Sequence, residues 1–129
     1  MGFWNFAWVM IGGAIGSAAR FWGSVVIAQR VGETFHWGTL IVNVIGCFVI
    51  GLFNTLTGPD GRWFLPIAAR QFVMIGICGG FTTFSAFSLQ TLALVQNGEW
   101  LHAGGNIVFS VGLCMIAVWL GHVLAANVS

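Results

Sequence analysis

Charged residues are scarce in this chain, and lysine is absent. Only 5% of the 129 residues are charged, against roughly 25% in an ordinary soluble domain. Hydrophobic residues make up 58% of the chain, and its mean hydropathy is +0.95. Such a chain cannot cover a water-exposed surface with polar groups. Its formal net charge is only +1, which is too small for the basic surface of a nucleic-acid-binding protein. The composition therefore indicates a membrane protein with a single domain, residues 1–129, and no nucleic-acid partner.

The sequence also lacks the residue patterns of known catalytic or metal centres. Its three acidic residues are isolated in polar segments, and its three cysteines show no CxxC spacing. Each cysteine lies in an apolar run, so we expect three free thiols. No Ser/His/Asp arrangement and no glycine-rich phosphate loop is present. The sequence therefore predicts that the protein is not an enzyme.

Four long apolar runs make up most of the chain. Each is near or above the ~20 residues that a helix needs to span the ~30 Å of hydrocarbon in a bilayer. The expected helices cover residues 3–28, 37–57, 65–96 and 101–126. Most of the seven tryptophans fall near the ends of these runs, as in an interfacial aromatic belt. The pattern predicts an all-α membrane protein with four transmembrane helices.

The arginines are balanced across the predicted membrane. With four spans, both termini share a side with the loop that carries Arg62, and Arg70 follows it; Arg20 and Arg30 belong to the other side. Two arginines against two give no preferred orientation under the positive-inside rule. Copies inserted in opposite directions could therefore pair as an antiparallel dimer. The alternatives are that Arg20 lies too deep to count, or that one orientation dominates.

Two GxxxG patterns predict close helix packing. Gly12 and Gly16 form one in the first run, and Gly76 and Gly80 form the other in the third run. This spacing lets helix backbones approach closely. Packing within one chain and packing between two copies are both compatible with it.

The centre of the third run is unusual for a transmembrane helix. Gly79 and Gly80 weaken the helix, and the hydroxyls of Thr82 and Thr83 compete for backbone groups. We therefore expect a break near residues 79–83, at membrane depth. Such a break is tolerated only where it is buried in protein or lines a cavity, and its freed carbonyls can coordinate a cation.

Polar and aromatic residues follow helical faces on three of the runs. The faces consist of Thr39, Asn43, Cys47, Ile50 and Asn54 on the second run; Phe84, Phe87, Ser88 and Thr91 after the break; and Asn106, Ser110 and Cys114 on the fourth run. Each face has two interpretations, interhelical packing or the lining of a pathway. The donors are neutral hydroxyls, amides and phenyl edges, and no carboxylate accompanies them, so a pathway would suit a small anion. Arg20 could draw anions to its mouth or act as a snorkelling anchor.

Three segments of the chain match the pattern of one known family. They are GGAIGSAAR at residues 12–20, GTLIVN at residues 38–43 and GGFTTFSAFS at residues 79–88. In these segments, and in length and loop lengths, the chain resembles the Fluc (CrcB) fluoride channels of bacteria. The resemblance implies a passive, fluoride-selective channel that exports cytoplasmic fluoride across the bacterial inner (plasma) membrane. It also implies an antiparallel, dual-topology homodimer with two pores.

The resemblance further implies roles for individual residues. The pore-lining residues that we expect are Thr39, Asn43, Phe84, Phe87, Ser88 and Ser110. A structural sodium ion at the dimer centre would be held by the backbone carbonyls of Gly79 and Thr82, and Arg20 would lie in a vestibule. Two positions depart from the family pattern, which often has glutamate at Gln90 and a second hydroxyl at Cys114. A thiol is a poor hydrogen-bond donor, so the polar track on the fourth helix is expected to differ at that end.

Two other functions remain open at this stage. A small proton-coupled multidrug exporter also has four helices, but it needs a carboxylate within the membrane. Glu33, Asp60 and Glu99 all fall in predicted loops. A non-transporting subunit of a membrane assembly would explain the glycines and tryptophans, but it would leave the polar faces without a role. The partners expected for the channel are fluoride, a second copy of the chain and the lipid bilayer.

Overall fold

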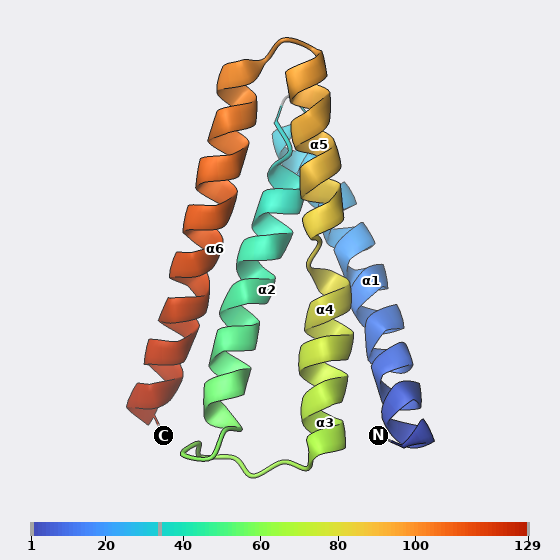
Figure 1. The fold of residues 1–129 in the computed structure, drawn as a ribbon, viewed down its shortest axis with the longest axis vertical. Coiled ribbons are helices and arrows are strands. Elements are labelled where there is room, and N and C mark those ends of the chain that lie inside the picture. Colours follow the sequence, from blue (N-terminus) through green and yellow to red (C-terminus); the bar gives the residue numbers. More distant parts are fainter. Residues whose placement is uncertain (1, 34, 129) are drawn as a thin grey trace.

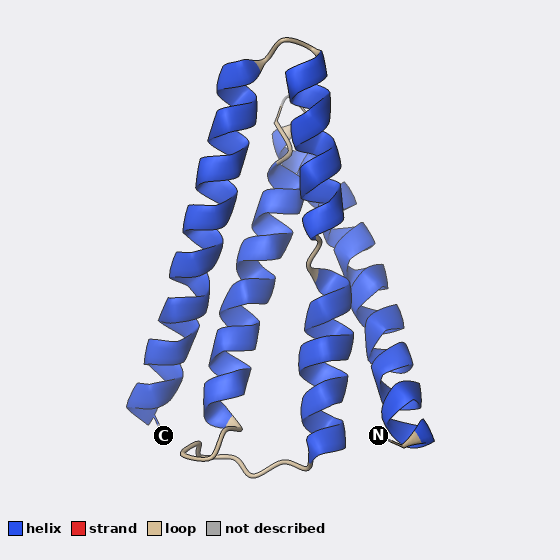
Figure 2. Cartoon of the chain, in the orientation of Figure 1, coloured by secondary structure: helices blue, strands red, loops and turns tan. Residues whose placement is uncertain are grey.

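The computed structural model describes residues 2–33 and 35–128, and within these residues all regular structure is helical (Figure 2). The helices are α1 (Phe3–Val31), α2 (Trp37–Leu56), α3 (Ile67–Gln71), the π-helix η1 (Phe72–Cys78), α4 (Gly79–Phe81), α5 (Phe84–Gln96) and α6 (Trp100–Val128). The elements α3 to α5 follow one another as one span, Ile67–Gln96, which we call the third span. Four spans are long and apolar enough to cross a membrane, which confirms the prediction of an all-α, multi-span membrane protein.

Proline and glycine set two of the helix ends. α1 continues to Val31, beyond its expected end, because nothing disfavours the helix before Gly32, whose φ is 86°. The third span begins at Ile67, later than expected, because Pro66 holds the residue before it, Leu65, out of the α region. These ends depend on local backbone chemistry, which hydropathy alone does not report.

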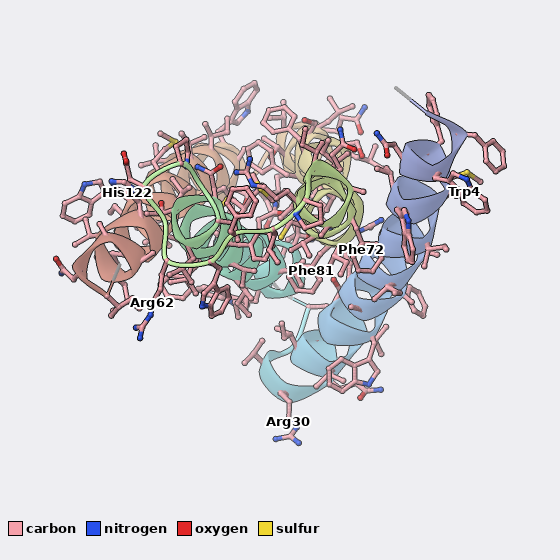
Figure 3. The ribbon with its side chains drawn as sticks, turned by 90° about the horizontal axis from the view of Figure 1, so that it is seen from below. Trp4, Arg30, Arg62, Phe72, Phe81 and His122 are labelled. Atoms are coloured by element: carbon pink, nitrogen blue, oxygen red, sulfur yellow. The ribbon has the colours of Figure 1, made fainter. Side chains whose placement is uncertain are left out.

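The four spans form two closely packed pairs. α2 packs along α6, and α1 packs obliquely against the third span (Figures 1 and 3). Both termini and the loop of residues 57–66 lie at one end of the bundle, and the spans spread apart towards that end (Figure 1). Four spans were expected to place both termini on the same side as this loop, and the structure agrees with that expectation (Figure 1).

The two GxxxG patterns pack against each other within one chain. A Cβ at Gly12 would lie 2.5 Å from the carbonyl oxygen of Phe72, and one at Gly16 would meet the carbonyl oxygen of Ile77. A Cβ at Gly76 would lie 2.9 Å from the Cα of Gly12. The absence of side chains at these positions therefore lets α1 approach the third span to backbone contact. The structure thus selects the within-chain alternative for these glycines.

Glycines also bring α2 and α6 together. A Cβ at Gly51 of α2 would meet the carbonyl oxygen of Val118 in α6, and one at Gly121 of α6 would meet the carbonyl oxygen of Phe48. The two helices are therefore in backbone contact over more than one turn. This contact fixes the register between the polar faces of α2 and α6.

The surface of the single chain is strongly apolar. Phe21, Ile67 and Leu101 are each at least 70% exposed, and few large side chains are fully buried. Monomeric soluble proteins rarely expose an apolar surface of this extent to water. Lipid, or another apolar protein surface, is the environment that suits it.

Candidate functional site

The third span is interrupted in its middle by two residues in extended conformation. α4 ends at Phe81, Thr82 and Thr83 have ψ angles of 160° and 116°, and α5 begins at Phe84 (Figure 1). Thr82 closes the first half of the span, because its N–H and its hydroxyl donate to the carbonyl oxygen of Cys78 at 3.0 and 2.9 Å. The interruption thus falls at the two threonines rather than at the two glycines before them.

Asn43 of α2 bridges the interruption. Its Nδ2 donates to the carbonyl oxygen of Thr83 at 3.0 Å, and the N–H of Thr83 donates to its Oδ1 at 2.7 Å. The side-chain amide therefore pairs with Thr83 as a second backbone strand would. Thr83 in turn caps α5, since its Oγ1 accepts a hydrogen bond from the N–H of Ala86 at 3.1 Å. One turn along α2, Gly46 leaves room for the methyl group of Thr82.

These bonds change the partners of two backbone carbonyls. In a continuous helix the N–H of Thr83 would bond to the carbonyl of Gly79, and the N–H of Ala86 would bond to that of Thr82. Both N–H groups are diverted to side chains instead. The carbonyl oxygens of Gly79 and Thr82 are therefore left without the partners that a continuous helix supplies.

Arg20 reaches the same level from α1. Its Nε donates to the carbonyl oxygen of Gly80 at 3.0 Å, and its side chain is half-buried. Gly80 lies near the middle of the third span, so Arg20 lies deeper than an arginine that snorkels from a helix end. A vestibule role for Arg20 therefore requires a vestibule that reaches the level of Gly80.

The other arginines lie near the ends of the bundle. Arg30 projects away from it (Figure 3). The Nη1 of Arg62 donates to the carbonyl oxygen of Val128 at the end of α6, at 3.3 Å. Arg70 donates to the Oδ1 of Asn54 at 2.9 Å and to the hydroxyl of Thr57 at 3.0 Å. With Arg20 near mid-height, the balance of arginines between the two ends rests on these three, and one end exceeds the other by a single arginine.

A groove of about 310 Å³ runs beside the interruption, between α2, α5 and α6. It brings together four of the six residues expected to line a pore, together with Thr82. Thr39 is buried outside the groove, and the hydroxyl of Ser88 donates to the carbonyl oxygen of Phe84. The groove is lined by Asn43, Cys47, Thr82, Thr83, Phe84, Phe87, Ser110, Val111, Cys114 and Met115.

Two phenylalanine rings form one wall of the groove. The ring centroids of Phe84 and Phe87 lie 5.3 Å apart, and their planes are tilted by 59°. Phe87 is 7% exposed, whereas Phe84 is 75% exposed. Phe87 is thus held by its own chain, while Phe84 needs lipid or another protein surface to cover it.

A chain of hydrogen bonds connects the groove to α5. The Ser110 hydroxyl donates to the Oδ1 of Asn106 at 3.2 Å, and the Nδ2 of Asn106 donates to the Thr91 hydroxyl at 2.9 Å. The Thr91 hydroxyl donates to the carbonyl oxygen of Phe87 at 2.8 Å. Asn106 and Thr91 lie on the predicted polar faces, but no sequence pattern pairs α5 with α6. Ser110 donates into the groove only if its hydroxyl rotates away from Asn106.

Two buried acceptors lack donors. The Oε1 atoms of Gln71 and Gln90 are buried, and no donor among the residues that the structure describes reaches them. Leaving a buried polar atom unpaired costs ~1–3 kcal/mol.

The acidic residues stay outside the spans, as predicted. Glu33, Asp60 and Glu99 all lie between helices. In the ranges 2–33 and 35–128, no group of three or more His, Cys, Asp or Glu residues could hold a metal ion. The groove is therefore a neutral site, with Arg20 as the charge bound at the level of the interruption.

The cap at the start of α5 yields a direct prediction. Replacing Thr83 with valine keeps the shape of the side chain but removes the oxygen that accepts from the N–H of Ala86. We expect a loss of ~1 kcal/mol in stability, measured as a lower midpoint of thermal unfolding in detergent. Thr83→Ser keeps the oxygen and serves as the control. Equal midpoints for the two variants would show that this cap contributes nothing.

Comparison with known proteins identifies close relatives over almost the whole chain. The family model described as "CrcB-like protein, Camphor Resistance (CrcB)" matches residues 7–122. A protein of Paramagnetospirillum magneticum named fluoride-specific ion channel FluC is 59% identical over 97% of this chain and 98% of its own length. Proteins with the same name from Methylocella silvestris and Rhodospirillum rubrum are 55% and 56% identical, over 97% of this chain and 95% and 97% of their own lengths.

Proposed function

The chain belongs to the CrcB-like family, and from this membership and the geometry of its groove we propose that it is a passive, fluoride-selective ion channel. It is a multi-pass protein of a bacterial membrane, and it is not an enzyme. The observation that carries the proposal is the neutral groove beside the interrupted span, which joins amide, hydroxyl and phenyl groups without a carboxylate.

The groove suits an anion that must be bound and released again. Fluoride is small and strongly hydrated, so a path must replace its water with several close donors. One N–H of the Asn43 amide is used on Thr83, and its second N–H remains for a ligand. The rings of Phe84 and Phe87 offer electropositive edges. None of these donors carries a full charge, so none would trap the ion.

We infer that two copies pair in opposite orientations and form two pores. Phe84 is largely exposed on the groove. A second copy would cover the ring. The small difference in the number of arginines at the two ends favours neither orientation strongly, which is compatible with dual topology. In this arrangement we expect Asn43 and Ser110 to line each pore together with the two rings.

A structural sodium ion fits the carbonyls at the interruption. The oxygens of Gly79 and Thr82 have lost their helical partners to Asn43 and to the Thr83 hydroxyl. One chain thus presents two carbonyls without their helical partners, and two chains would present four. A hard cation prefers such oxygen ligands, and bound there it would hold the two copies together.

The direction of flow follows from acid–base chemistry. Fluoride that enters a cell as neutral hydrogen fluoride dissociates in a neutral cytoplasm and accumulates as the anion. A passive pore then lets it leave down its own gradient. We therefore expect net export through the bacterial inner membrane.

The alternatives account for fewer of these observations. A proton-coupled multidrug exporter needs a carboxylate within the membrane, and the three acids lie between helices. A non-transporting assembly subunit gives no reason for a groove with convergent polar groups.

Anion efflux from liposomes that carry the purified protein tests the proposed function. We expect fast fluoride efflux without chloride efflux, because the groove offers a narrow set of close donors. Phe84→Leu, which removes a ring edge from the groove, should slow fluoride at least about tenfold, or ~1.4 kcal/mol of barrier. Phe21→Leu replaces an exposed ring on α1, outside the groove, and is the matched control. Chloride efflux as fast as that of fluoride would contradict selectivity, and no efflux from intact dimers would favour the assembly subunit.

A further inference from the structure

Two thiols face each other in the groove. Cys47 of α2 and Cys114 of α6 both line it. One turn further along, a Cβ at Gly51 would meet the carbonyl oxygen of Val118, so the helices that carry the thiols are in backbone contact. The helix backbones thus hold the two sulfur atoms close together.

The groove also contains a third sulfur atom. Met115 follows Cys114 and lines the same groove with its thioether. Cys47 and Cys114 are free thiols and half-buried, so a small ion in the groove can reach them. Cys78 is a free thiol too, but it is 4% exposed and does not line the groove. The chain therefore carries its own matched control for any reaction of the pair.

We propose that Cys47 and Cys114 form a binding site for a soft, thiophilic divalent metal ion that accepts two ligands, of which Hg²⁺ is the type. Soft thiolate and thioether ligands select such ions over hard ones. The ion displaces one proton from each thiol, two S–Hg bonds form, and both protons leave to water. The complex of one Hg²⁺ with two thiolates is electrically neutral.

The charge of the metal ion and the number of ligands it prefers together set the preference among metals. A net charge at membrane depth is costly, and two thiolates cancel the charge of one divalent ion. Zn²⁺ has the same charge but prefers four ligands in a tetrahedron. The described lining of the groove offers it two thiols and one thioether and no histidine or carboxylate. The site should therefore bind Hg²⁺ far more tightly than Zn²⁺.

Occupation of the site would also close the path for fluoride. A metal between Cys47 and Cys114 lies in the same groove as Asn43 and Phe87. It would bridge α2 and α6 and narrow the groove that an anion must pass. This second consequence rests on the proposed channel function, whereas metal binding itself does not.

Metal binding is tested first, on the full chain in detergent. The protein is incubated with Hg²⁺ as the nitrate and desalted; bound mercury is measured, and alkylation of each cysteine is followed by mass spectrometry. We expect stoichiometric mercury on the wild-type chain and on Cys78→Ser, with Cys47 and Cys114 shielded together. Cys47→Ser and Cys114→Ser each keep one thiol of the pair, so a competing monothiol should strip their mercury while the wild type retains it. Retention by both of these variants against the monothiol, or shielding of Cys78 alone, would overturn the site; the shielding pattern needs no variant and decides the question even if a variant fails to fold.

Fluoride efflux from liposomes then tests the block. Hg²⁺ should reduce efflux of the wild type and of Cys78→Ser at least about tenfold, excess dithiothreitol should restore it, and Zn²⁺ at the same concentration should leave it unchanged. Efflux through the double variant Cys47→Ser/Cys114→Ser should resist Hg²⁺. Full efflux with mercury bound would refute the block. Stoichiometric mercury on a protein that never conducts fluoride would support the site and reject the proposed function.

Discussion

Replacing Asn43 with alanine should reduce fluoride efflux by roughly 100-fold, equivalent to ~2.7 kcal/mol of barrier. The amide of Asn43 satisfies both the N–H and the carbonyl of Thr83 across the interruption. Without it, two part-buried backbone groups lose their partners, at up to ~1–3 kcal/mol each. The cheapest repair returns the N–H of Thr83 to the carbonyl of Gly79, which would extend the helix into the interruption. The same substitution removes the amide N–H that faces the groove.

The measurement separates these two losses. Efflux tests the groove, and the sodium dependence of dimer stability in detergent tests the proposed sodium site at the carbonyl of Gly79. We expect both to fall in Asn43→Ala. Asn43→Asp keeps an oxygen for the N–H of Thr83 but places an anionic group in the groove, so it should block efflux and retain more of the dimer. Asn54→Ala is the matched control, since it removes an amide from the other end of the same helix, where the partner is Arg70. An Asn43→Ala variant with normal efflux would show that the bridge does not support conduction.

Replacing Gly80 with alanine should strongly impair folding. A Cβ there would lie 2.6 Å from the carbonyl oxygen of Gly13, 3.1 Å from its Cα and 3.2 Å from the N of Ser17. All three atoms belong to the backbone of α1 and cannot rotate away. α1 must then move off the third span, and the bond from Arg20 to the Gly80 carbonyl stretches or breaks. Overpacking of this kind costs ~1–3 kcal/mol.

Stability in detergent measures this effect directly. We expect Gly80→Ala to give little monodisperse protein and a lower midpoint of thermal unfolding. Gly104→Ala is the control, because nothing lies within 4 Å of a Cβ at Gly104. That variant should match the wild type or slightly exceed its stability, since alanine favours helix over glycine. Equal midpoints for the two variants would mean that α1 and the third span are not in backbone contact.

Local sequence patterns predicted the four spans better than they predicted the position of the break. The four spans follow from the hydropathy of each run, since a bilayer demands about 20 apolar residues whatever the partners. The break was expected near residues 79–83, because glycines and threonines weaken a helix locally. Its position at Thr82 and Thr83 depends on Asn43, which lies 40 residues from Thr83 in the sequence. A pattern of neighbouring residues therefore cannot predict where the break falls.

The helix before the interruption shows the same limit. The stretch Phe72–Cys78 forms a π-helix, and its apolar composition gives no reason to expect one. Backbone contact between Gly76 and Gly12 occurs on this stretch. Single turns of π-helix are rare and cluster at functional sites. Here a π-helix directly precedes Gly79, the first of the two residues whose carbonyls are proposed to bind sodium.

Amino-acid composition and helical spacing therefore determined that the protein lies in a membrane and how many spans it has. They also determined that its acidic residues lie in loops and that its polar faces are neutral. These properties depend on the residue types within each run, so they can be read without a partner. Tertiary structure alone decided that Arg20 binds the Gly80 carbonyl, that Asn43 bridges Thr83, and that Ser110 joins Asn43 and Phe87 in one groove. These contacts join residues on different helices, and the helix register that permits them is set by backbone contact at glycines. The physical reason is that the hydrogen-bond partner of a buried polar group is chosen by packing in three dimensions, which no single run specifies.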